Sequence, residues 1–557
     1  MSVQEKNVAE FIVSCLEAEG VKYVFGIPGE ENIKLVRAIA ASKQIRFILV
    51  RHEQGASFMA DIYGRLTGKA GVCVATLGPG AINLLLGTAD AQTDSSPLVA
   101  ISAQVGLNRI YKESHQIVDL TALFKPVTKW ADVVITPDSL PEMIRKAFHL
   151  AQEERPGATY LAIPQDLEGV GIPEGLLPLK PMLAGAHGKN TPAPAAIKQA
   201  AEILRSARNP VIMAGHGVAR SGSAAALTRF ADQYQIPVAT TFMGKGVISD
   251  RNPLALGVIG FMHHDYENFA FDEADVILFI GYELQEFSPE RINPHGDKKI
   301  IHINAFSPDI DKHYLTDLSI TADIELTLTA LSNTLGAQPL SKLADGVKIR
   351  ELLEEELAKG RASNDFPLKP QRIVCDIRAA LGDDDIVLAD TGAIKMWMAR
   401  LYPTYSPLTC LTSNGLSTMA FSLPGAIGAH FAAPDKKVLA VMGDGSFMMN
   451  SQEIETAVRE NIPLKVLVWV DGSYGLIKWK MDIEEGAHDS VDFGNPDFVK
   501  YAESFGASAY HVDSADALLP TLQKALAEPG VTIVACPVDY SENMKLIDKL
   551  GELTIAL

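Results

Sequence analysis

The feature that most constrains the fold is an alternation of short apolar runs with longer amphipathic segments, which continues along the whole 557-residue chain. Apolar runs of strand length separated by segments of helical period are typical of βα units around a parallel sheet. We therefore predict an α/β fold with doubly wound parallel sheets throughout. The strand-like runs include residues 45–50, 71–76, 98–102, 210–214, 276–280, 386–389, 438–442 and 464–470.

Two stretches interrupt the alternation and predict domain boundaries. Residues 171–194 are rich in proline, glycine and alanine, and residues 336–370 include an acidic piece of helical character at 350–356. Both stretches are typical of linkers. Because one core seldom organises more than about 250–300 residues, the length alone predicts two to four domains, and the two linkers divide the chain into three α/β domains. Their predicted limits are residues 1–175, 190–340 and 365–557.

Charge and composition exclude several classes of protein. The chain has 68 acidic and 49 basic side chains and a formal net charge of −19, the wrong sign for a general nucleic-acid binder. It has neither a run of about 18 apolar residues nor a basic and apolar leader, so we expect neither membrane insertion nor export. The five scattered cysteines form no CxxC pair and are expected to be reduced thiols in a cytoplasmic protein.

A candidate phosphate and metal site lies in the C-terminal third. The apolar run 438–442 leads into Gly443-Asp444-Gly445-Ser446 and then into a helical segment. A strand, a glycine turn and a helix N-terminus present free backbone N–H groups that suit a phosphate, although a turn without a ligand is an equally good interpretation. The next strand ends at Asp471, 27 positions after Asp444 (471 − 444). Two carboxylates at adjacent strand ends, beside a diphosphate, suit Mg²⁺.

These residues resemble the motif of the thiamine diphosphate-dependent enzyme superfamily. The match covers Gly443 to Ser446 and resumes at Asp471-Gly472-Ser473-Tyr474-Gly475, where the usual motif closes with asparagines. The resemblance implies that Asp444, Asp471 and the Ser473 carbonyl bind Mg²⁺. It also implies that the cofactor contacts Gly443, Gly445, Ser446 and Tyr474, together with Gly392 and Ala393 of a second diphosphate loop at 390–393.

The N-terminal third contains a second matching segment. Arg51-His52-Glu53-Gln54-Gly55 follows the run 45–50 and resembles the catalytic glutamate segment of this superfamily. Thiamine chemistry needs a carboxylic acid at N1′ of the aminopyrimidine, so that N4′ can take the C2 proton of the thiazolium ring. Glu53 is predicted to fill this role, although a glutamate after a strand is more often a solvated or helix-capping residue. Gly26, Gly78 and Asn83 lie in two further segments, 24–29 and 76–83, that resemble cofactor loops.

Several segments resemble the catabolic, FAD-independent acetolactate synthases in particular. The resemblance implies that Gln116 and Phe124 line the substrate side of the site. It further implies that Met419 supports the cofactor in its bent conformation and that the Ser417 carbonyl accepts a hydrogen bond from the 4′-amino group. Ordinary core packing is the alternative interpretation of Met419. The matching segments are residues 115–116, 123–129, 280–287, 491–498, 500–507 and 537–543.

The chain departs from this family pattern in places. Ala420 stands where these synthases usually have glycine, and residues 474–481 replace a segment in which catabolic synthases place glutamines near the substrate. Lys480 in that segment could attract a carboxylate or simply lie on an exposed helix face. His263 and His264 suit the proton relay of a 2-oxo acid decarboxylase, but loop histidines are commonly only hydrogen-bonded.

The resemblance implies a cytoplasmic enzyme that uses thiamine diphosphate and Mg²⁺ to decarboxylate pyruvate and join the product to a second pyruvate, giving 2-acetolactate. It places each site across two subunits and so implies a homodimer or homotetramer. The alternative activity is a decarboxylase that releases an aldehyde. A non-catalytic regulatory homologue, or a structural subunit that holds FAD, is a different class of hypothesis that the intact Glu53, Asp444 and Asp471 disfavour. FAD is possible but is not predicted, because residues 214–220 only half-match a dinucleotide fingerprint.

Overall fold

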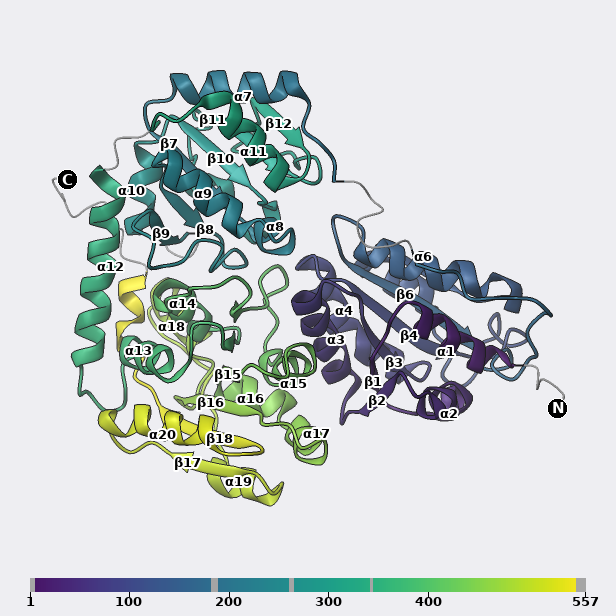
Figure 1. The fold of residues 1–557 in the computed structure, drawn as a ribbon. Helices are drawn as coiled ribbons and strands as arrows, with labels where there is room; N and C mark the ends of the chain where they lie inside the picture. Colours follow the sequence, from purple (N-terminus) through teal and green to yellow (C-terminus); the bar gives the residue numbers. More distant parts are fainter. Residues whose placement is uncertain (1–5, 182–188, 260–264, 341–343, 547–557) are drawn as a thin grey trace. The chain divides into compact units, whose positions relative to one another are not determined.

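The computed structural model describes residues 6–181, 189–259, 265–340 and 344–546 (Figure 1). Its named strands form three six-stranded sheets, and each pair of neighbouring strands is parallel. Helices lie in most of the connections between strands, whereas β8 leads to β9 and β11 leads to β12 through loops. The prediction of an α/β fold with three doubly wound parallel sheets is therefore confirmed.

The first sheet has the strand order β2-β1-β3-β4-β6-β5. The winding direction reverses between β1 and β3, so the carboxyl ends of these two strands form the switch point at which doubly wound sheets bind ligands. The strands are β1 Tyr23–Gly26, β2 Arg46–Leu49, β3 Gly71–Ala75, β4 Leu98–Gln104, β5 Trp130–Val133 and β6 Ala158–Pro164. The helices are α1 Val8–Ala18, α2 Ile33–Ala41, α3 Glu53–Thr67, α4 Pro79–Thr93, α5 Leu120–Phe124 and α6 Leu140–Gln152.

The second sheet has the order β12-β11-β10-β7-β8-β9, with its switch point between β7 and β10. All five residues of β10 are buried, as expected for a parallel strand that is covered by helices on both faces. The strands are β7 Pro210–Ala214, β8 Val238–Thr240, β9 Ala255–Val258, β10 Val276–Ile280, β11 Lys299–Asn304 and β12 Leu318–Thr321. The helices are α7 Pro194–Ser206, α8 His216–Arg220, α9 Ala224–Tyr234, α10 Tyr266–Asp272 and α11 Ile324–Leu335.

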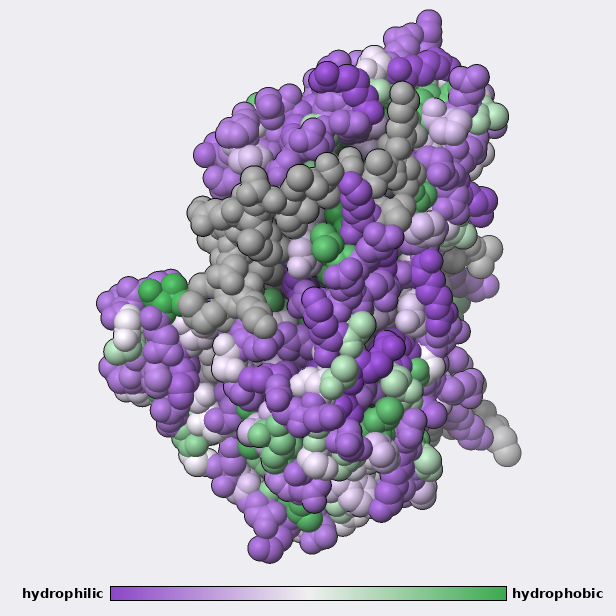
Figure 2. Space-filling view, turned by 90° about the vertical axis from the view of Figure 1, so that its left-hand side faces the viewer, coloured by the Kyte–Doolittle hydropathy of each residue, from purple (hydrophilic) through white to green (hydrophobic). Residues whose placement is uncertain are grey.

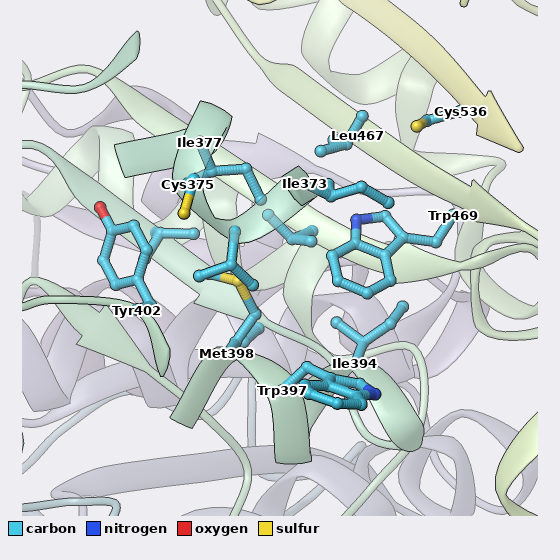
Figure 3. Packing of buried hydrophobic residues seen from close by; sticks show 14 of the residues in the cluster. Ile373, Cys375, Ile377, Ile394, Trp397, Met398, Tyr402, Leu467, Trp469 and Cys536 are labelled. Atoms are coloured by element: carbon cyan, nitrogen blue, oxygen red, sulfur yellow. The ribbon is translucent and has the colours of Figure 1, made fainter. Parts of the chain in front are cut away.

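The third sheet has the order β14-β13-β15-β16-β18-β17, which places its switch point between β13 and β15. One face is covered by a core that includes Trp397 and Trp469 (Figure 3). The strands are β13 Ile386–Ala389, β14 Cys410–Leu411, β15 Val438–Gly443, β16 Lys465–Val470, β17 Ser508–His511 and β18 Thr532–Pro537. The helices from residue 370 onward are α13 Pro370–Ala380, α14 Ala393–Leu401, α15 Ser422–Ala432, α16 Asp444–Asn450, α17 Glu453–Arg459, α18 Gly475–Glu484, α19 Phe498–Ser504 and α20 Ala515–Ala527.

The stretch 336–370, which we expected to be a linker, contains a packed helix. Helix α12, Ala344–Ala362, contacts α13 and α10. Its buried residues Ile349, Leu353 and Leu357 recur every four positions and so lie on one face of the helix. This spacing is present in the sequence, but the high content of glutamate around it makes the segment resemble an exposed connector.

The chain divides into two compact units that do not follow the three sheets. The first unit combines Met1–Ala186 with two later segments, Gly415–Asp435 and Met449–Leu464, and the second unit contains the remaining residues. Helix α15 of the first inserted segment packs on α3. A Cβ atom at Gly428 would lie 2.3 Å from the Met59 carbonyl oxygen, so the two helices can approach this closely only with glycine there.

The hydropathy of the surface and the unpaired state of the cysteines match what the composition predicts. Hydrophilic residues cover most of the face shown in Figure 2, and the hydrophobic residues lie among them in small groups. In the described part of the chain, none of the helices combines the length and apolar character that a membrane crossing requires. The five cysteines are all buried and form no disulfide.

Candidate active site

Glu53 is the first residue of α3, where the chain turns from β2 into the helix. The preceding residue, His52, caps the helix, because its Nδ1 accepts a hydrogen bond from the Gln54 backbone N–H at 3.1 Å. Only 8% of Glu53 is exposed, and its Oε2 accepts a hydrogen bond from Asn83 Nδ2 on α4 at 3.0 Å. The structure therefore brings together the predicted catalytic glutamate and one of the predicted cofactor-loop residues.

The loop after β3 makes room for Glu53. A Cβ atom at Gly80 would lie 3.2 Å from Glu53 Oε1 and 2.9 Å from Thr76 Cγ2, so glycine keeps this space open. Gly78 has a φ of +51°, and a Cβ there would lie 2.9 Å from the Gln116 carbonyl oxygen. Gln116 itself has a φ of +59°, which is uncommon for a residue other than glycine. The same short loop therefore contacts both Glu53 and Gln116.

Two other predicted residues of this unit have well-defined structural surroundings. Gly26 ends β1, and a Cβ atom there would lie 2.1 Å from the Val74 carbonyl oxygen on β3, so strand packing alone requires glycine. Phe124 ends α5 and is fully buried, with its ring stacked on that of Tyr160 at a centroid distance of 3.8 Å. The substrate-side role of Phe124 stays a prediction.

The loop that carries Ser417 and Met419 also belongs to the first unit. Ser417 has a φ of +53° and is exposed, and Met419 is half-buried. Ala420, which replaces the glycine usual in the family, is fully buried and has a φ of +67°. The backbone at Ala420 thus has the left-handed conformation that favours glycine, which accounts for the usual residue at this position.

Two aspartates hold this loop, namely Asp90 of α4 and Asp94, the C-cap residue of that helix. Asp94 Oδ1 accepts a hydrogen bond from the Gly415 backbone N–H at 2.6 Å, and Asp90 Oδ1 accepts one from Thr418 Oγ1 at 3.0 Å. Both aspartates lie next to the buried guanidinium of Arg65, which is 3.2 Å from Asp94 Oδ2 and 4.0 Å from Asp90 Oδ2. Sequence reasoning missed these two residues because nothing in a helical segment indicates which distant loop it contacts.

Asp444 joins the two halves of the predicted metal motif in the second unit. It follows β15 and is 1% exposed. Its Oδ2 accepts hydrogen bonds from the backbone N–H groups of Asp471 at 3.1 Å and Gly472 at 2.7 Å, and its Oδ1 accepts one from Gly445 at 2.8 Å. The carboxylate therefore holds the turn after β15 against the turn after the neighbouring strand β16.

Asp471 is the second carboxyl group of this motif. Burial, and after it the nearby Asp444 carboxylate, raises the pKa of Asp471 to about 6. The hydroxyl of Ser473 donates a hydrogen bond to Asp471 Oδ2 at 2.9 Å. The nearby Asp444 carboxylate destabilises the charged form of the half-buried Asp471, and a divalent cation between the two groups removes this repulsion. The electrostatics of the pair therefore fit a bound metal ion.

Asn495 is a residue of this site that sequence reasoning missed. Its Nδ2 donates a hydrogen bond to Asp444 Oδ2 at 2.8 Å, and its Oδ1 is buried without a partner among the described residues. In the sequence, the segment 491–498 is notable only for its resemblance to catabolic acetolactate synthases. No spacing rule connects an asparagine with an aspartate 51 positions earlier.

The glycine turns leave space where a diphosphate is predicted. A Cβ atom at Gly445 would lie 2.9 Å from the ring of Tyr474, so only glycine fits beneath this side chain. Gly392, which precedes α14, has a φ of +130°, and nothing lies within 4 Å of the position of its missing Cβ. The buried Thr391 Oγ1 beside it has no partner among the described residues. The other predicted contacts, Gly443, Ser446 and Ala393, lie at the ends of β15 and the starts of α16 and α14.

The side chains alone do not form a metal cage. In the residues that the structure describes, no group of three or more His, Cys, Asp or Glu side chains is arranged to hold a metal ion. Asp444 and Asp471 supply two carboxylates, and the Ser473 carbonyl is a backbone oxygen. Mg²⁺ typically takes one or two carboxylates and completes its octahedron with phosphate oxygens and water. This donor set fits Mg²⁺ held together with a diphosphate.

The comparisons with known proteins point to the same chemistry. Residues 6–123 match the model for the thiamine pyrophosphate enzyme N-terminal TPP binding domain, residues 197–331 the central domain and residues 390–536 the C-terminal TPP binding domain. The acetolactate synthase of Bacillus subtilis is 36% identical, over 99% of this chain and 97% of the relative. The catabolic acetolactate synthase of Raoultella terrigena is 35% identical, over 97% of both chains. The large subunit of Escherichia coli acetolactate synthase isozyme 1 is 33% identical, over 96% of this chain and 94% of the relative.

The chain belongs to the acetolactate synthase family of thiamine pyrophosphate enzymes. Thiamine pyrophosphate and thiamine diphosphate are the same compound, so the predicted family is confirmed. The relatives include a catabolic acetolactate synthase as well as large subunits of other acetolactate synthases.

The central domain of this family member contains the half-matched dinucleotide fingerprint. Its switch point lies after β7, where the backbone N–H of His216 donates to both oxygens of the buried Glu286 at 3.2 and 3.1 Å. Thr241 donates a further hydrogen bond to Glu286, and a Cβ at Gly215 would lie 2.6 Å from Glu286 Oε1. A carboxyl group of the protein thus occupies the place where a dinucleotide phosphate binds in other switch points.

The other residues that depart from the family pattern are Lys480, His263 and His264. Lys480 is exposed on α18, and its neighbour Lys478 pairs with Asp492 at 2.9 Å. His263 and His264 lie outside the described residues. The roles of all three therefore stay predictions.

Proposed function

We propose that this protein is a cytoplasmic acetolactate synthase that converts two molecules of pyruvate into one of 2-acetolactate and one of CO₂. The observation that carries the proposal is that the reactive residues Glu53, Asp444 and Asp471 are intact in a chain similar to acetolactate synthases along almost its whole length. Thiamine diphosphate, when bound, supplies the electron sink that the cleavage of the pyruvate carbon–carbon bond requires.

In the first unit, Glu53 holds a proton at N1′ of the aminopyrimidine, and Asn83 fixes the direction of the Glu53 carboxyl group. Gln116, beside Gly78 in the same unit, binds the substrate, and Phe124 supports its segment from the core. Ser417 and Met419 orient the aminopyrimidine ring through a carbonyl group and a flexible apolar side chain.

In the second unit, Asp444, Asp471 and the Ser473 carbonyl hold Mg²⁺, and Asn495 keeps the Asp444 carboxylate in place. The backbone N–H groups at the start of α16 and α14 bind the diphosphate, because a helix N-terminus favours anions. Gly443, Gly445 and Ser446 contribute from the first of these loops, and Gly392 and Ala393 from the second. Tyr474 covers Gly445 from one side.

We further propose that the active assembly is a homodimer or a homotetramer. Ile82 and Leu86 on α4 are 43% and 38% exposed, and they lie on either side of Asn83 in sequence. They are four positions apart and so share one face of the helix. A second copy of the chain would cover this apolar face next to the catalytic glutamate and so exclude water from the site.

A 2-oxo acid decarboxylase that releases an aldehyde is the second candidate. The observation that favours it is helix α18, since residues 474–481, which include the exposed Lys480, contain no glutamine, whereas the catabolic pattern has glutamines in this segment. A site without those amides could hold the second pyruvate less well, and the product would then leave as acetaldehyde.

A product balance distinguishes the two activities. We would incubate the purified protein with thiamine diphosphate, Mg²⁺ and pyruvate, and quantify pyruvate, CO₂, acetolactate and acetaldehyde. We expect two pyruvates consumed and one acetolactate formed for each CO₂. One pyruvate consumed and one acetaldehyde formed for each CO₂ would identify the decarboxylase instead. A Glu53→Gln variant with full activity would contradict both assignments.

A further inference from the structure

A second glutamate is buried at the start of the catalytic helix. Glu453 is the first residue of α17, lies in the first unit and has no exposed surface. Its Oε1 accepts hydrogen bonds from the backbone N–H groups of Arg51 at 3.1 Å and His52 at 3.0 Å. Its Oε2 accepts one from Thr456 Oγ1 at 2.6 Å. The Glu453 carboxyl group therefore binds the two residues that lead into Glu53.

The catalytic segment has a matching space for this carboxyl group. A Cβ atom at Gly55 would lie 2.8 Å from Glu453 Oε1 and 3.0 Å from its Cδ. Gly55 lies inside the 15-residue helix α3, where its φ is not in the left-handed region and alanine has the better helix propensity. Glycine at this position is therefore explained by the side chain of Glu453 rather than by the backbone.

The hydrogen bonds to Glu453 offset part of the cost of burying its carboxyl group. Burial raises the pKa of Glu453 to about 7, and the donors Thr456, Arg51 and His52 oppose that rise. The carboxyl group also lies at the N-terminal end of α3, where the helix dipole favours negative charge. An ordinary packing position would be filled by an apolar residue, so a buried carboxyl group with these donors indicates a specific task.

We propose that Glu453 is a positioning residue for Glu53. By holding the N–H groups of Arg51 and His52, Glu453 fixes the turn from which α3 starts and so directs the Glu53 carboxyl group toward Asn83. The inference rests on the proposed function, because the position of Glu53 matters only if Glu53 carries a proton for the cofactor. In the sequence, a residue with this role is indicated by the glutamate nine positions after Asp444, in the helical segment that follows the metal motif.

The variant that tests this inference is Glu453→Gln. Glutamine has the same size, but its NH₂ group cannot accept a hydrogen bond, so one of the contacts to Arg51, His52 or Thr456 is lost. The matched control is Glu455→Gln, which makes the same change two residues later, where Glu455 pairs with Arg459 at 3.1 Å. Three quantities are measured for each protein: kcat and KM for pyruvate, the dissociation constant of thiamine diphosphate, and the rate at which the C2 proton of the bound cofactor exchanges for deuterium.

We expect Glu453→Gln to lower kcat and the C2 exchange rate together by about 10- to 100-fold, since a small misplacement of a catalytic group has effects of this size. KM and the dissociation constant of the cofactor should change by less than about threefold, because Glu453 is not expected to touch either ligand. Backbone amide exchange at Arg51 and His52 should become faster in the cofactor-free variant. The control Glu455→Gln should match the wild type in all of these measurements.

A second variant covers the case in which Glu453→Gln does not fold. Gly55→Ala leaves Glu453 in place but pushes a methyl group against its carboxyl group, in a helix that alanine stabilises. It should lower the C2 exchange rate in the same way while the thermal transition stays cooperative. A C2 exchange rate equal to that of the wild type in both variants would overturn the inference, and so would a loss of cofactor binding that accounts for the whole effect.

The same measurements separate this inference from the proposed function. If the wild-type protein exchanges the C2 proton in a Glu53-dependent manner but forms no acetolactate, the proposed reaction is wrong and the positioning role of Glu453 is still tested by the exchange rate. If Glu53→Gln exchanges the C2 proton as fast as the wild type, the role of Glu53 is wrong and the inference about Glu453 is overturned with it.

Discussion

Asn83 donates the hydrogen bond that fixes the Glu53 carboxyl group, with 3.0 Å between Asn83 Nδ2 and Glu53 Oε2. The two residues come from neighbouring helices of the first unit, α4 and α3, and are 30 positions apart in sequence. The contact leaves the second carboxyl oxygen, Oε1, facing the space that Gly80 keeps open. One oxygen of Glu53 is therefore held by the protein while the other is next to a glycine loop.

Replacing Asn83 should reduce catalysis without unfolding the protein. Asn83→Ala removes a hydrogen bond to the Glu53 carboxyl group, and such bonds contribute about 1–2 kcal/mol, which corresponds to about a 5- to 30-fold lower kcat. The measurement is the initial rate of CO₂ release from pyruvate at saturating cofactor. An unchanged kcat in a protein with an unchanged melting temperature would contradict the contact's role.

Replacing Asn495 should weaken metal-dependent cofactor binding. Asn495→Ala removes the donor that orients Asp444 Oδ2, and loss of a residue that orients a metal ligand weakens binding about 10- to 100-fold. Titration of the apoprotein with Mg²⁺ in the presence of thiamine diphosphate measures this effect directly. The control is Asp492→Asn, an exposed residue of the same loop that pairs with Lys478. Equal affinities for the two variants would show that Asn495 does not act on Asp444.

Position 420 should accept glycine but not valine. Ala420 has a φ of +67° and no exposed surface. Glycine relieves backbone strain of about 1–2 kcal/mol, but it loses a buried methyl group worth about 0.8 kcal/mol, so we expect the free energy of unfolding to change by less than about 1 kcal/mol. A β-branched side chain is far less compatible with the left-handed region, and Ala420→Val should lower the melting temperature and the activity together. Thermal denaturation of the two variants and the wild type tests this order, and a valine variant as stable as the wild type would refute it.

The buried Glu286 makes stability depend on pH. Burial, and after it the neighbouring Glu283 carboxylate, raises the pKa of Glu286 from its ordinary value of 4.5 to about 8 in the folded protein. Between these two values the folded chain binds a proton that the unfolded chain has released, so the contribution of Glu286 to the free energy of unfolding falls as the pH rises. The contribution is fully present below about pH 4.5 and is lost as the pH rises through 8.

Glu286→Gln removes this titration, because glutamine does not ionise. We expect the melting temperature of the variant, relative to the wild type, to increase from pH 5 to pH 9. Each kcal/mol of change in the free energy of unfolding should shift the melting temperature by about 2–4 °C. Melting curves of both proteins at pH 5, 7 and 9 provide the measurement. A difference that stays constant across this range would mean that Glu286 keeps its ordinary pKa.

The sequence was most informative where local pattern decides the structure. Runs such as 276–280 and 386–389 coincide with strands β10 and β13, because a parallel strand buried on both faces has to be apolar throughout. Glu53 and Asp444 follow strands of sheets in which ligands bind at the carboxyl ends, so their places near a switch point could be predicted. The helix α12 could not, because its buried apolar residues Ile349, Leu353 and Leu357 are separated by the acidic residues of an exposed face.

The contacts that sequence reasoning missed join residues far apart in the chain. Glu453 contacts Arg51 across 402 positions, and Asp94 contacts Gly415 across 321. Neither a hydrophobic period nor a motif spacing indicates such a pair, because the sequence around each partner has nothing unusual. The division into two units was missed for the same reason, since the segments 415–435 and 449–464 look like parts of the C-terminal domain.

The interleaving of the two units also restricts how the protein can be made in the cell. The first sheet ends with β6 at Pro164, but the first unit is completed only by residues up to Leu464. A ribosome therefore has to release most of the chain before α15 can pack on α3. Until then the apolar face of α3 stays open, and we expect nascent chains to need chaperones during this interval and truncated chains to aggregate.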